Sequence, residues 1–114
     1  MVPATVTPFS YLGKGRNRIA FRHGKWVIKV PLNEDGMTDN YHEARVYRKG
    51  KGLPTPDGIR YARCRLIPNS DILVMELLEI DATQEPPTWS GFVDCGQVGI
   101  SREGGWRAYD FGLL

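Results

Sequence analysis

The chain has little cysteine. Cys64 and Cys95 are its two cysteines; they lie far apart, and neither belongs to a Cys-x-x-Cys pair or to a cluster with histidine. This pattern argues against a disulfide-rich scaffold and against the usual zinc sites. We expect reduced thiols, and the sequence leaves a single bridge between the two open.

Long apolar runs are also missing. Nowhere does an apolar stretch reach the roughly 18 residues that a membrane-spanning helix needs. The first ten residues contain no basic flank leading into an apolar segment, so a secretory signal is not indicated. We therefore predict a cytoplasmic protein with no membrane partner.

Acidic residues are absent from the first third of the chain. Residues 1–33 contain no Asp or Glu but hold six cations: Lys14, Arg16, Arg18, Arg22, Lys25 and Lys29. A surface of one charge sign raises the local concentration of ligands of the opposite sign. Nucleotide phosphates and nucleic acid are both candidate ligands, and a merely solvated strand face remains the alternative.

What is present indicates one folded α+β domain. The 114 residues are 41% hydrophobic and 25% charged, which is typical of a globular fold with one core. Alternating residues and turn signals predict strands at 9–12, 18–22, 25–30, 59–67 and 72–77. Residues 79–91 read as an extended crossing, followed by a hairpin of 92–100 and 106–110.

One helix is expected between the third and fourth strands. An apolar stripe with spacings of four and three begins at Met37, and Thr38 or Asp39 is the candidate N-cap. The stripe continues through Tyr41, Ala44 and Tyr47. Cations and glycines at 49–52 then end the helix.

Five features with chemical meaning follow one another along this framework. They are a glycine turn at Gly13 and Gly15, Lys29 inside an apolar strand, Glu43 in the helix, an apolar strand ending at residues 75–78, and Asp110-Phe111-Gly112. Glycines let backbone amides approach phosphate oxygens. A lysine among apolar residues needs an anion, and a carboxylate suits a magnesium ion bound to phosphates.

In this order the features resemble the protein kinase family, in particular its small lobe and the hairpin that carries the Asp-Phe-Gly motif. "VIK" at 27–29 resembles the family's third-strand motif, and "YDFG" at 109–112 resembles its metal-binding corner. The chain is also similar to compact kinase-like proteins of bacterial and phage genomes. The resemblance implies a five-stranded antiparallel sheet with one packed helix (9–78), a hinge (79–91) and a C-terminal β-hairpin (92–112) within a single domain, 1–114.

The resemblance also implies ATP and magnesium as cofactors, and roles for individual residues. Lys29 would contact the phosphates and be oriented by Glu43. The nucleotide-binding set would be completed by the loop residues Gly13, Gly15 and Arg18, by Val27 with Ala20 over the base, and by the backbone of Glu76 and Leu78 at the base edge, beside Met75.

The remaining implied roles depart from the family's pattern. Arg18 replaces the third glycine of the loop, and the metal ligands would be Asp110 and Gln97, the latter where the family has Asn. The family's catalytic base falls on Phe92. Asp94 is either a displaced base or a surface carboxylate.

These departures favour a reduced kinase-like domain that lacks protein kinase activity, although the sequence leaves open whether it is an enzyme. The Asp-Phe-Gly motif stands two residues from the end of the sequence, and 79–91 is too short for a helical subdomain. We expect a protein partner or self-association through an exposed apolar lower face, and the sequence leaves open whether a nucleotide is also bound. That face would comprise Leu77, Leu78, Phe92, Phe111, Leu113 and Leu114.

Two alternatives remain open. A minimal phosphotransferase would use ATP and magnesium with Lys29 and Asp110. A nucleic-acid-binding protein would use the basic first third, but this reading rests on charge alone and is the least favoured.

Overall fold

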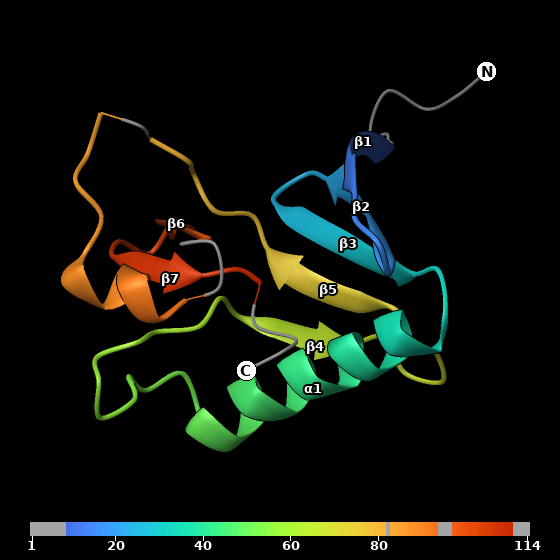
Figure 1. Ribbon diagram of the computed structural model, residues 1–114. Helices are drawn as coiled ribbons and strands as arrows, with labels where there is room; N and C mark the ends of the chain where they lie inside the picture. Colours follow the sequence, from blue (N-terminus) through green and yellow to red (C-terminus); the bar gives the residue numbers. More distant parts are fainter. Residues whose placement is uncertain (1–8, 82, 94–96, 111–114) are drawn as a thin grey trace.

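The computed structural model describes residues 9–81, 83–93 and 97–110. A five-stranded antiparallel sheet has the strand order β1-β2-β3-β5-β4, helix α1 packs on it, and β6 and β7 form a separate hairpin (Figure 1). The predicted α+β architecture is confirmed. The elements are β1 (Phe9–Lys14), β2 (Arg18–His23), β3 (Trp26–Pro31), α1 (Glu34–Gly50), β4 (Cys64–Leu66), β5 (Leu73–Glu76), the 3-10 helix η1 (Thr88–Phe92), β6 (Val98–Ile100) and β7 (Trp106–Ala108).

The first three strands form the expected meander. Gly24 has a φ of 62° in the turn between β2 and β3, a backbone conformation that favours glycine. Ala20 on β2 pairs with Gly13 on one side and with Lys29 on the other. Because directly opposed residues project from the same face of a sheet, these three positions form one row across the strands.

Helix α1 begins earlier than predicted. Its N-cap is Asn33, whose side-chain oxygen accepts a hydrogen bond from the amide of Gly36 at 2.9 Å, so the expectation of Thr38 or Asp39 was wrong. Glycine in the first turn had obscured this start. Gly36 is needed there, because a Cβ would lie 2.1 Å from the carbonyl oxygen of Asn17. The helix ends as predicted, with Lys51 in the left-handed region.

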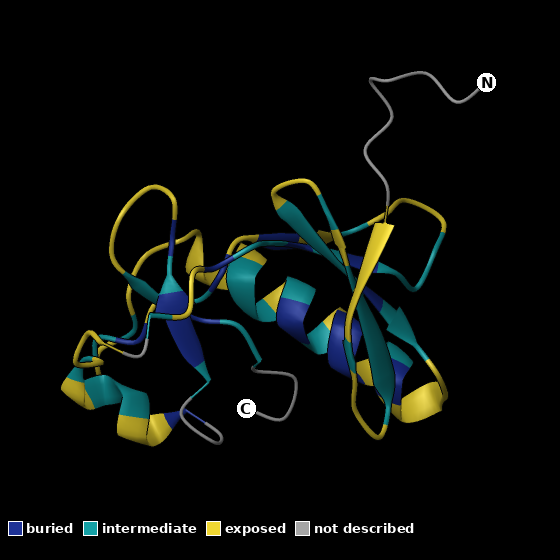
Figure 2. Ribbon diagram, turned by 90° about the horizontal axis from the view of Figure 1, so that it is seen from above, coloured by how far each residue is buried: buried dark blue, intermediate teal, exposed yellow. Residues whose placement is uncertain are grey.

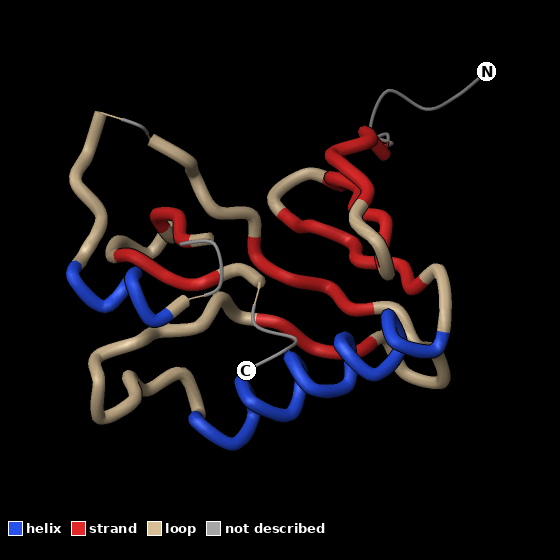
Figure 3. The backbone as a smooth tube through the Cα atoms, viewed as in Figure 1, coloured by secondary structure: helices blue, strands red, loops and turns tan. Residues whose placement is uncertain are grey.

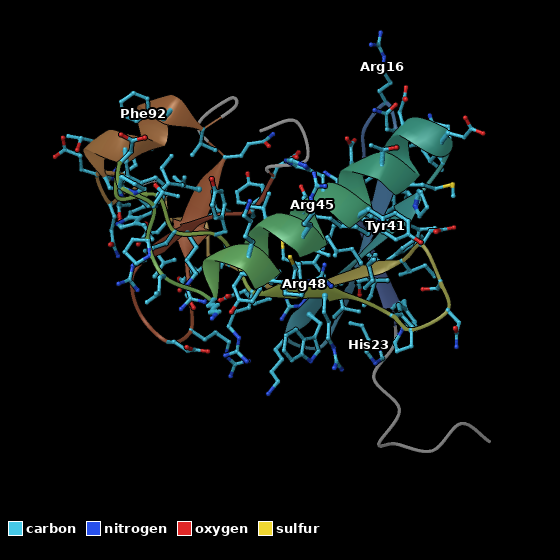
Figure 4. The ribbon with its side chains drawn as sticks, turned by 90° about the horizontal axis from the view of Figure 1, so that it is seen from below. Arg16, His23, Tyr41, Arg45, Arg48 and Phe92 are labelled. Carbon is cyan, nitrogen blue, oxygen red and sulfur yellow. The ribbon has the colours of Figure 1, made fainter. Side chains whose placement is uncertain are left out.

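The predicted apolar stripe of α1 is wrong at Tyr41, which is 50% exposed and lies with Arg45 and Arg48 on the outer side of the helix (Figure 4). Ala44 and Tyr47 of the stripe do pack against the core, but the buried positions of the helix include polar ones, namely Asp39, Asn40 and Glu43. Polar groups are costly to bury without partners, so these polar side chains must meet complementary groups.

The fourth strand is shorter than predicted. Only Cys64–Leu66 pairs with β5, whereas the preceding backbone is bonded to the hairpin: the amide of Ala62 donates to the carbonyl of Ala108, whose own amide donates to that of Arg60. The residues before β4 therefore bind the hairpin rather than extend the large sheet.

The predicted strand 92–100 is also too long. Phe92 ends the 3-10 helix η1 instead, β6 spans only Val98–Ile100, and the last part of the predicted extended crossing, 88–91, is also in η1, with the amide of Ser90 bonded to the carbonyl of Pro87. Figure 3 shows this 3-10 turn beside the hairpin and the long loop that leads to it.

The hairpin is fixed against the end of the sheet. Glu79 and Ile100 exchange two backbone hydrogen bonds. Gly99 allows this approach, since a Cβ there would lie 2.7 Å from Cβ of Leu78. The carboxylate of Glu76 accepts from Arg107 and from Ser101 of the hairpin.

One continuous core links helix, sheet and hairpin, whereas β1 is exposed along most of its length (Figure 2). The fully buried side chains of this core include Leu73 and Met75 of β5. The hairpin contributes Val98 and Ala108. Among the residues that the structure describes, no helix is long and apolar enough to cross a membrane.

Candidate functional site

A cleft of about 590 Å³ opens between the sheet and the end of the hairpin. Its walls come from β1 and the β1–β2 turn, from β2 and β3, from α1, from β5 and the segment after it, and from the residues after β7. They include Gly13, Gly15, Arg18, Ala20, Val27, Lys29, Asp39, Met75, Glu76, Leu78, Tyr109 and Asp110. The structure thus brings Lys29 and Asp110 to one cleft, as the resemblance predicted.

Lys29 and Glu43 form a buried ion pair in the wall of this cleft. Nζ of Lys29 lies 2.9 Å from Oε1 of Glu43, whose side chain is 0% exposed. A second hydrogen bond, 2.6 Å long, runs from Nζ of Lys29 to the backbone carbonyl oxygen of Tyr109. Lys29 therefore joins strand, helix and hairpin.

Arg18 enters the same network from β2. Its guanidinium binds Glu43 through two hydrogen bonds of 2.7 and 3.1 Å, and Nη2 also lies 3.0 Å from Oδ1 of Asp110. Arg18, which stands where the family has its third loop glycine, thus points its side chain into the domain. By contrast, Arg16 of the same turn is exposed and projects outward (Figure 4).

Asn40 is a member of the network that the sequence analysis missed. Its side-chain oxygen accepts from Nη1 of Arg18 at 3.0 Å, and its amide donates to the backbone oxygens of Lys29 and Asp71. Residues three apart share one face of a helix. The Asn40-x-x-Glu43 spacing was the signal that would have identified it.

Burial and mutual attraction set the pKa values of this network in opposite directions. Burial lowers the pKa of Lys29 in spite of the charge of Glu43. Burial alone would raise the pKa of Glu43, but the charges and hydrogen bonds of Lys29 and Arg18 hold it below its usual value. Partial burial raises the pKa of Asp110, although Lys29 and Arg18 act against this shift.

The glycine turn behaves differently at its two predicted positions. The amide of Gly15 donates to the carbonyl oxygen of Arg18 at 2.9 Å, so it is used within the turn. A Cβ at Gly13 would meet nothing within 4 Å, although the residue lines the cleft. Open space over Gly13 leaves room for a ligand to approach the backbone.

Part of the cleft lining is apolar. This part includes Ala20, Val27, Met75 and Leu78. The backbone amide of Leu78 has no hydrogen-bond partner within the described part of the chain. The Glu76 carboxylate is engaged with Arg107 and Ser101, which leaves only its backbone for the predicted role.

Two predicted residues are not part of this cleft as described. Gln97 does not line it, and its buried Oε1 has no hydrogen-bond partner among the described residues. Asp94 lies outside the described residues. Their predicted roles as metal ligand and base stay predictions.

Only part of the predicted apolar lower face lies within the described residues. Leu78 is 8% exposed and belongs to the cleft wall, which removes it from that face, whereas Phe92 is 67% exposed on η1. Leu77 is of intermediate exposure and also lines the cleft. Phe111, Leu113 and Leu114 lie outside the described residues, and the predicted partner stays a prediction.

Magnesium, which the resemblance implies, does not fit the described arrangement. Of its two predicted ligands only Asp110 lines the cleft, and Oδ1 of Asp110 is hydrogen-bonded to a guanidinium. A magnesium ion bound to phosphates takes only one or two carboxylates from the protein, and at Asp110 the oxygen Oδ1 is already bound to Arg18.

Comparison with known proteins supports the fold. No protein-family model matches the chain, and no curated protein sequence matches it. Among solved structures, the chain is similar to the ADP-bound aminoglycoside phosphotransferase APH(2'')-Ib, with a TM-score of 0.50 and 19% identity. The match covers 68% of this chain and 26% of that chain, so the chain spans about a quarter of the phosphotransferase's length. The chain has a kinase-like fold of the small-lobe type, and an identity this low establishes the fold alone.

Proposed function

We propose that this chain binds a purine nucleotide, ATP or ADP, in the cleft between the sheet and the hairpin. The observation that carries the proposal is the shared wall formed by Lys29, paired with Glu43 at 2.9 Å, and Asp110. Fold similarity to an ADP-bound phosphotransferase supports it.

The apolar and the charged parts of the cleft lining suit the base and the phosphates of a nucleotide. The base would lie between Ala20, Val27 and Met75, with the unpaired amide of Leu78 donating to its edge. Pockets for small molecules are commonly apolar with a few convergent polar groups. The phosphates would lie toward Gly13 and the ammonium of Lys29.

Lys29 is prepared for a phosphate oxygen by its surroundings. Two of its three N–H groups bind Glu43 and the carbonyl of Tyr109, which fixes the ammonium in the cleft wall. The third has no partner in the described part of the chain. Glu43 thereby orients the lysine without itself contacting the ligand.

We further propose that the chain supplies the nucleotide-binding half of a phosphotransferase-like arrangement and lacks protein kinase activity by itself. Phosphoryl transfer requires an acceptor hydroxyl held in line with the leaving group. Phe92 occupies the sequence position of the family's base and is exposed on η1. The proposal includes a partner protein that presents the acceptor hydroxyl or covers Phe92.

Calorimetric titration with ADP and with ATP tests nucleotide binding. We expect saturable binding by the wild-type chain and at least a tenfold loss of affinity, about 1.4 kcal/mol, in Lys29→Met. Lys25→Met, the same change at an exposed position outside the cleft, should bind normally.

A second variant covers the case in which Lys29→Met does not fold. Ala20→Phe fills the apolar part of the cleft but leaves every charge in place. It should abolish binding while retaining a cooperative thermal transition. Absence of heat with both nucleotides, or undiminished binding by Ala20→Phe, would refute the proposal.

A further inference from the structure

We propose that Arg18 takes the place of a divalent cation at Asp110, so that the cleft binds its nucleotide without magnesium. This inference rests on the proposed nucleotide binding. It assigns to the guanidinium of Arg18 the role of orienting Asp110, so that no metal ion is needed for this.

The guanidinium is held by four separate hydrogen bonds. Its terminal nitrogens donate to Asn40, twice to Glu43 and once to Asp110, and the side chain is 12% exposed. An arginine presents five N–H donors in a rigid planar fork. Four of the five are therefore used, and Nε–H has no partner in the described part of the chain.

This arrangement places positive charge directly against Asp110. Nη2 of Arg18 lies 3.0 Å from Oδ1 of Asp110, and the charge of Lys29 also acts on that carboxylate. Asp110 is thus oriented by a cation that belongs to the chain, which is the role a metal ion would otherwise have.

A divalent cation at the same oxygen would be repelled by Arg18. Like charges in a partly buried site repel each other strongly, and a doubly charged ion roughly doubles that repulsion. Arg18 cannot relieve the repulsion by losing its proton, because its hydrogen bond and charge interaction with Glu43 raise its pKa despite the opposing effect of burial.

Phosphate oxygens still have donors in the cleft. Nε–H of Arg18 and the third N–H of Lys29 are not used by the described residues. Both side chains line the cleft. Both are charge-assisted donors of the kind that bind phosphate oxygens directly, without a bridging metal.

The test compares ADP affinity in excess EDTA with that in excess magnesium chloride, by calorimetry. Wild type should give dissociation constants within about twofold of each other. Arg18→Gly, which restores the family's glycine, should bind at least tenfold more weakly in EDTA, about 1.4 kcal/mol. It should regain affinity with magnesium, because Asp110 is released to bind it. Arg22→Gly, the same change on β2 outside the cleft, should behave as wild type.

The outcomes separate the inference from the proposed function. If wild type binds ADP only with magnesium, the inference is overturned and the nucleotide site stands. If it binds in neither buffer, the nucleotide site and the inference both fail. If Arg18→Gly also binds equally in both buffers, Arg18 is not the substitute.

A measurement on wild type alone covers the case in which the glycine variant does not fold. Manganese chloride titrated into the complex of protein and ADP should give the electron paramagnetic resonance spectrum of manganese in ADP solution without protein. A spectrum of protein-bound manganese would overturn the inference.

Discussion

The ammonium of Lys29 on β3 donates a hydrogen bond of 2.6 Å to the backbone carbonyl oxygen of Tyr109, 80 residues later in the chain. The same ammonium is paired with Glu43 of α1. One side chain thus connects the sheet, the helix and the segment that carries Asp110. The charged network of the cleft is for this reason also part of what holds the domain together, and its removal should lower the stability of the fold.

Replacing Glu43 should destabilise the fold. Glu43→Gln leaves Lys29 and Arg18 buried without their shared anion, and breaking a buried pair in this way costs about 3–5 kcal/mol. Denaturant unfolding followed by circular dichroism measures the loss. Glu34→Gln, at the exposed first turn of the same helix, removes only an interaction with the helix dipole and should cost under about 1 kcal/mol. Equal losses would show that Glu43 does not anchor the network.

Acid should unfold the domain through the same carboxylate. The pKa of Glu43 lies below its ordinary value of 4.5 in the folded protein, so the unfolded chain binds this proton more tightly. The stabilisation is therefore complete above pH 4.5 and is lost as the pH falls through the lowered pKa. The pKa of Asp110 is raised in the folded protein, so protonation of Asp110 stabilises the fold as the pH falls. Asp110→Asn lacks this stabilising protonation. Its thermal midpoint should therefore fall more steeply than that of wild type between pH 6 and pH 3, which lie about 1.5 units either side of 4.5.

Two glycine-to-alanine changes in α1 should have opposite signs. Gly36→Ala places a Cβ 2.1 Å from the carbonyl oxygen of Asn17, backbone that cannot move aside without separating the helix from the β1–β2 turn. Gly50→Ala meets nothing within 4 Å and raises helix propensity by about 0.5–1 kcal/mol. Thermal unfolding should show a lower midpoint for the first and an unchanged or higher one for the second. A stabilised Gly36→Ala would contradict the packing described.

Gly99→Ala should loosen the hairpin from the sheet. The added Cβ would lie 2.7 Å from Leu78 and 3.1 Å from the carbonyl oxygen of Glu79, whose bonds to Ile100 fix the hairpin. Amide hydrogen exchange should then speed up at Ile100 and at Ala108. Gly91→Ala on η1 has open space and serves as the control. Unchanged exchange at both amides would show that this contact does not hold the hairpin.

Cys64 should be inert in the folded protein. Burial is the main reason that the pKa of its thiol is raised to about 12, and Sγ donates to the backbone oxygen of Glu43. In a Cys95→Ser background, alkylation at pH 8, about four units below that pKa, should proceed only as the domain opens. Its rate should rise in Glu43→Gln and not in Glu34→Gln. Rapid alkylation of the native protein would mean that Cys64 is accessible.

The sequence by itself determined the framework. Alternation of apolar residues, glycine turns and the cations and glycines after residue 48 depend on neighbours along the chain, so the β1–β3 meander, the helix end and β5 were predictable near their observed bounds. The resemblance to the kinase family, carried by the order of the glycine turn, Lys29, Glu43 and Asp110, implied that Lys29 and Asp110 share a cleft.

Only the tertiary structure decided how the polar groups pair. The inward direction of Arg18, the buried polar side of α1 around Asn40, and the shortening of β4 all follow from contacts between residues tens of positions apart. Local periodicity carries no information about such contacts. A buried charge takes whichever partner the assembled fold brings within hydrogen-bonding distance, because an unpaired one costs more than any local preference supplies.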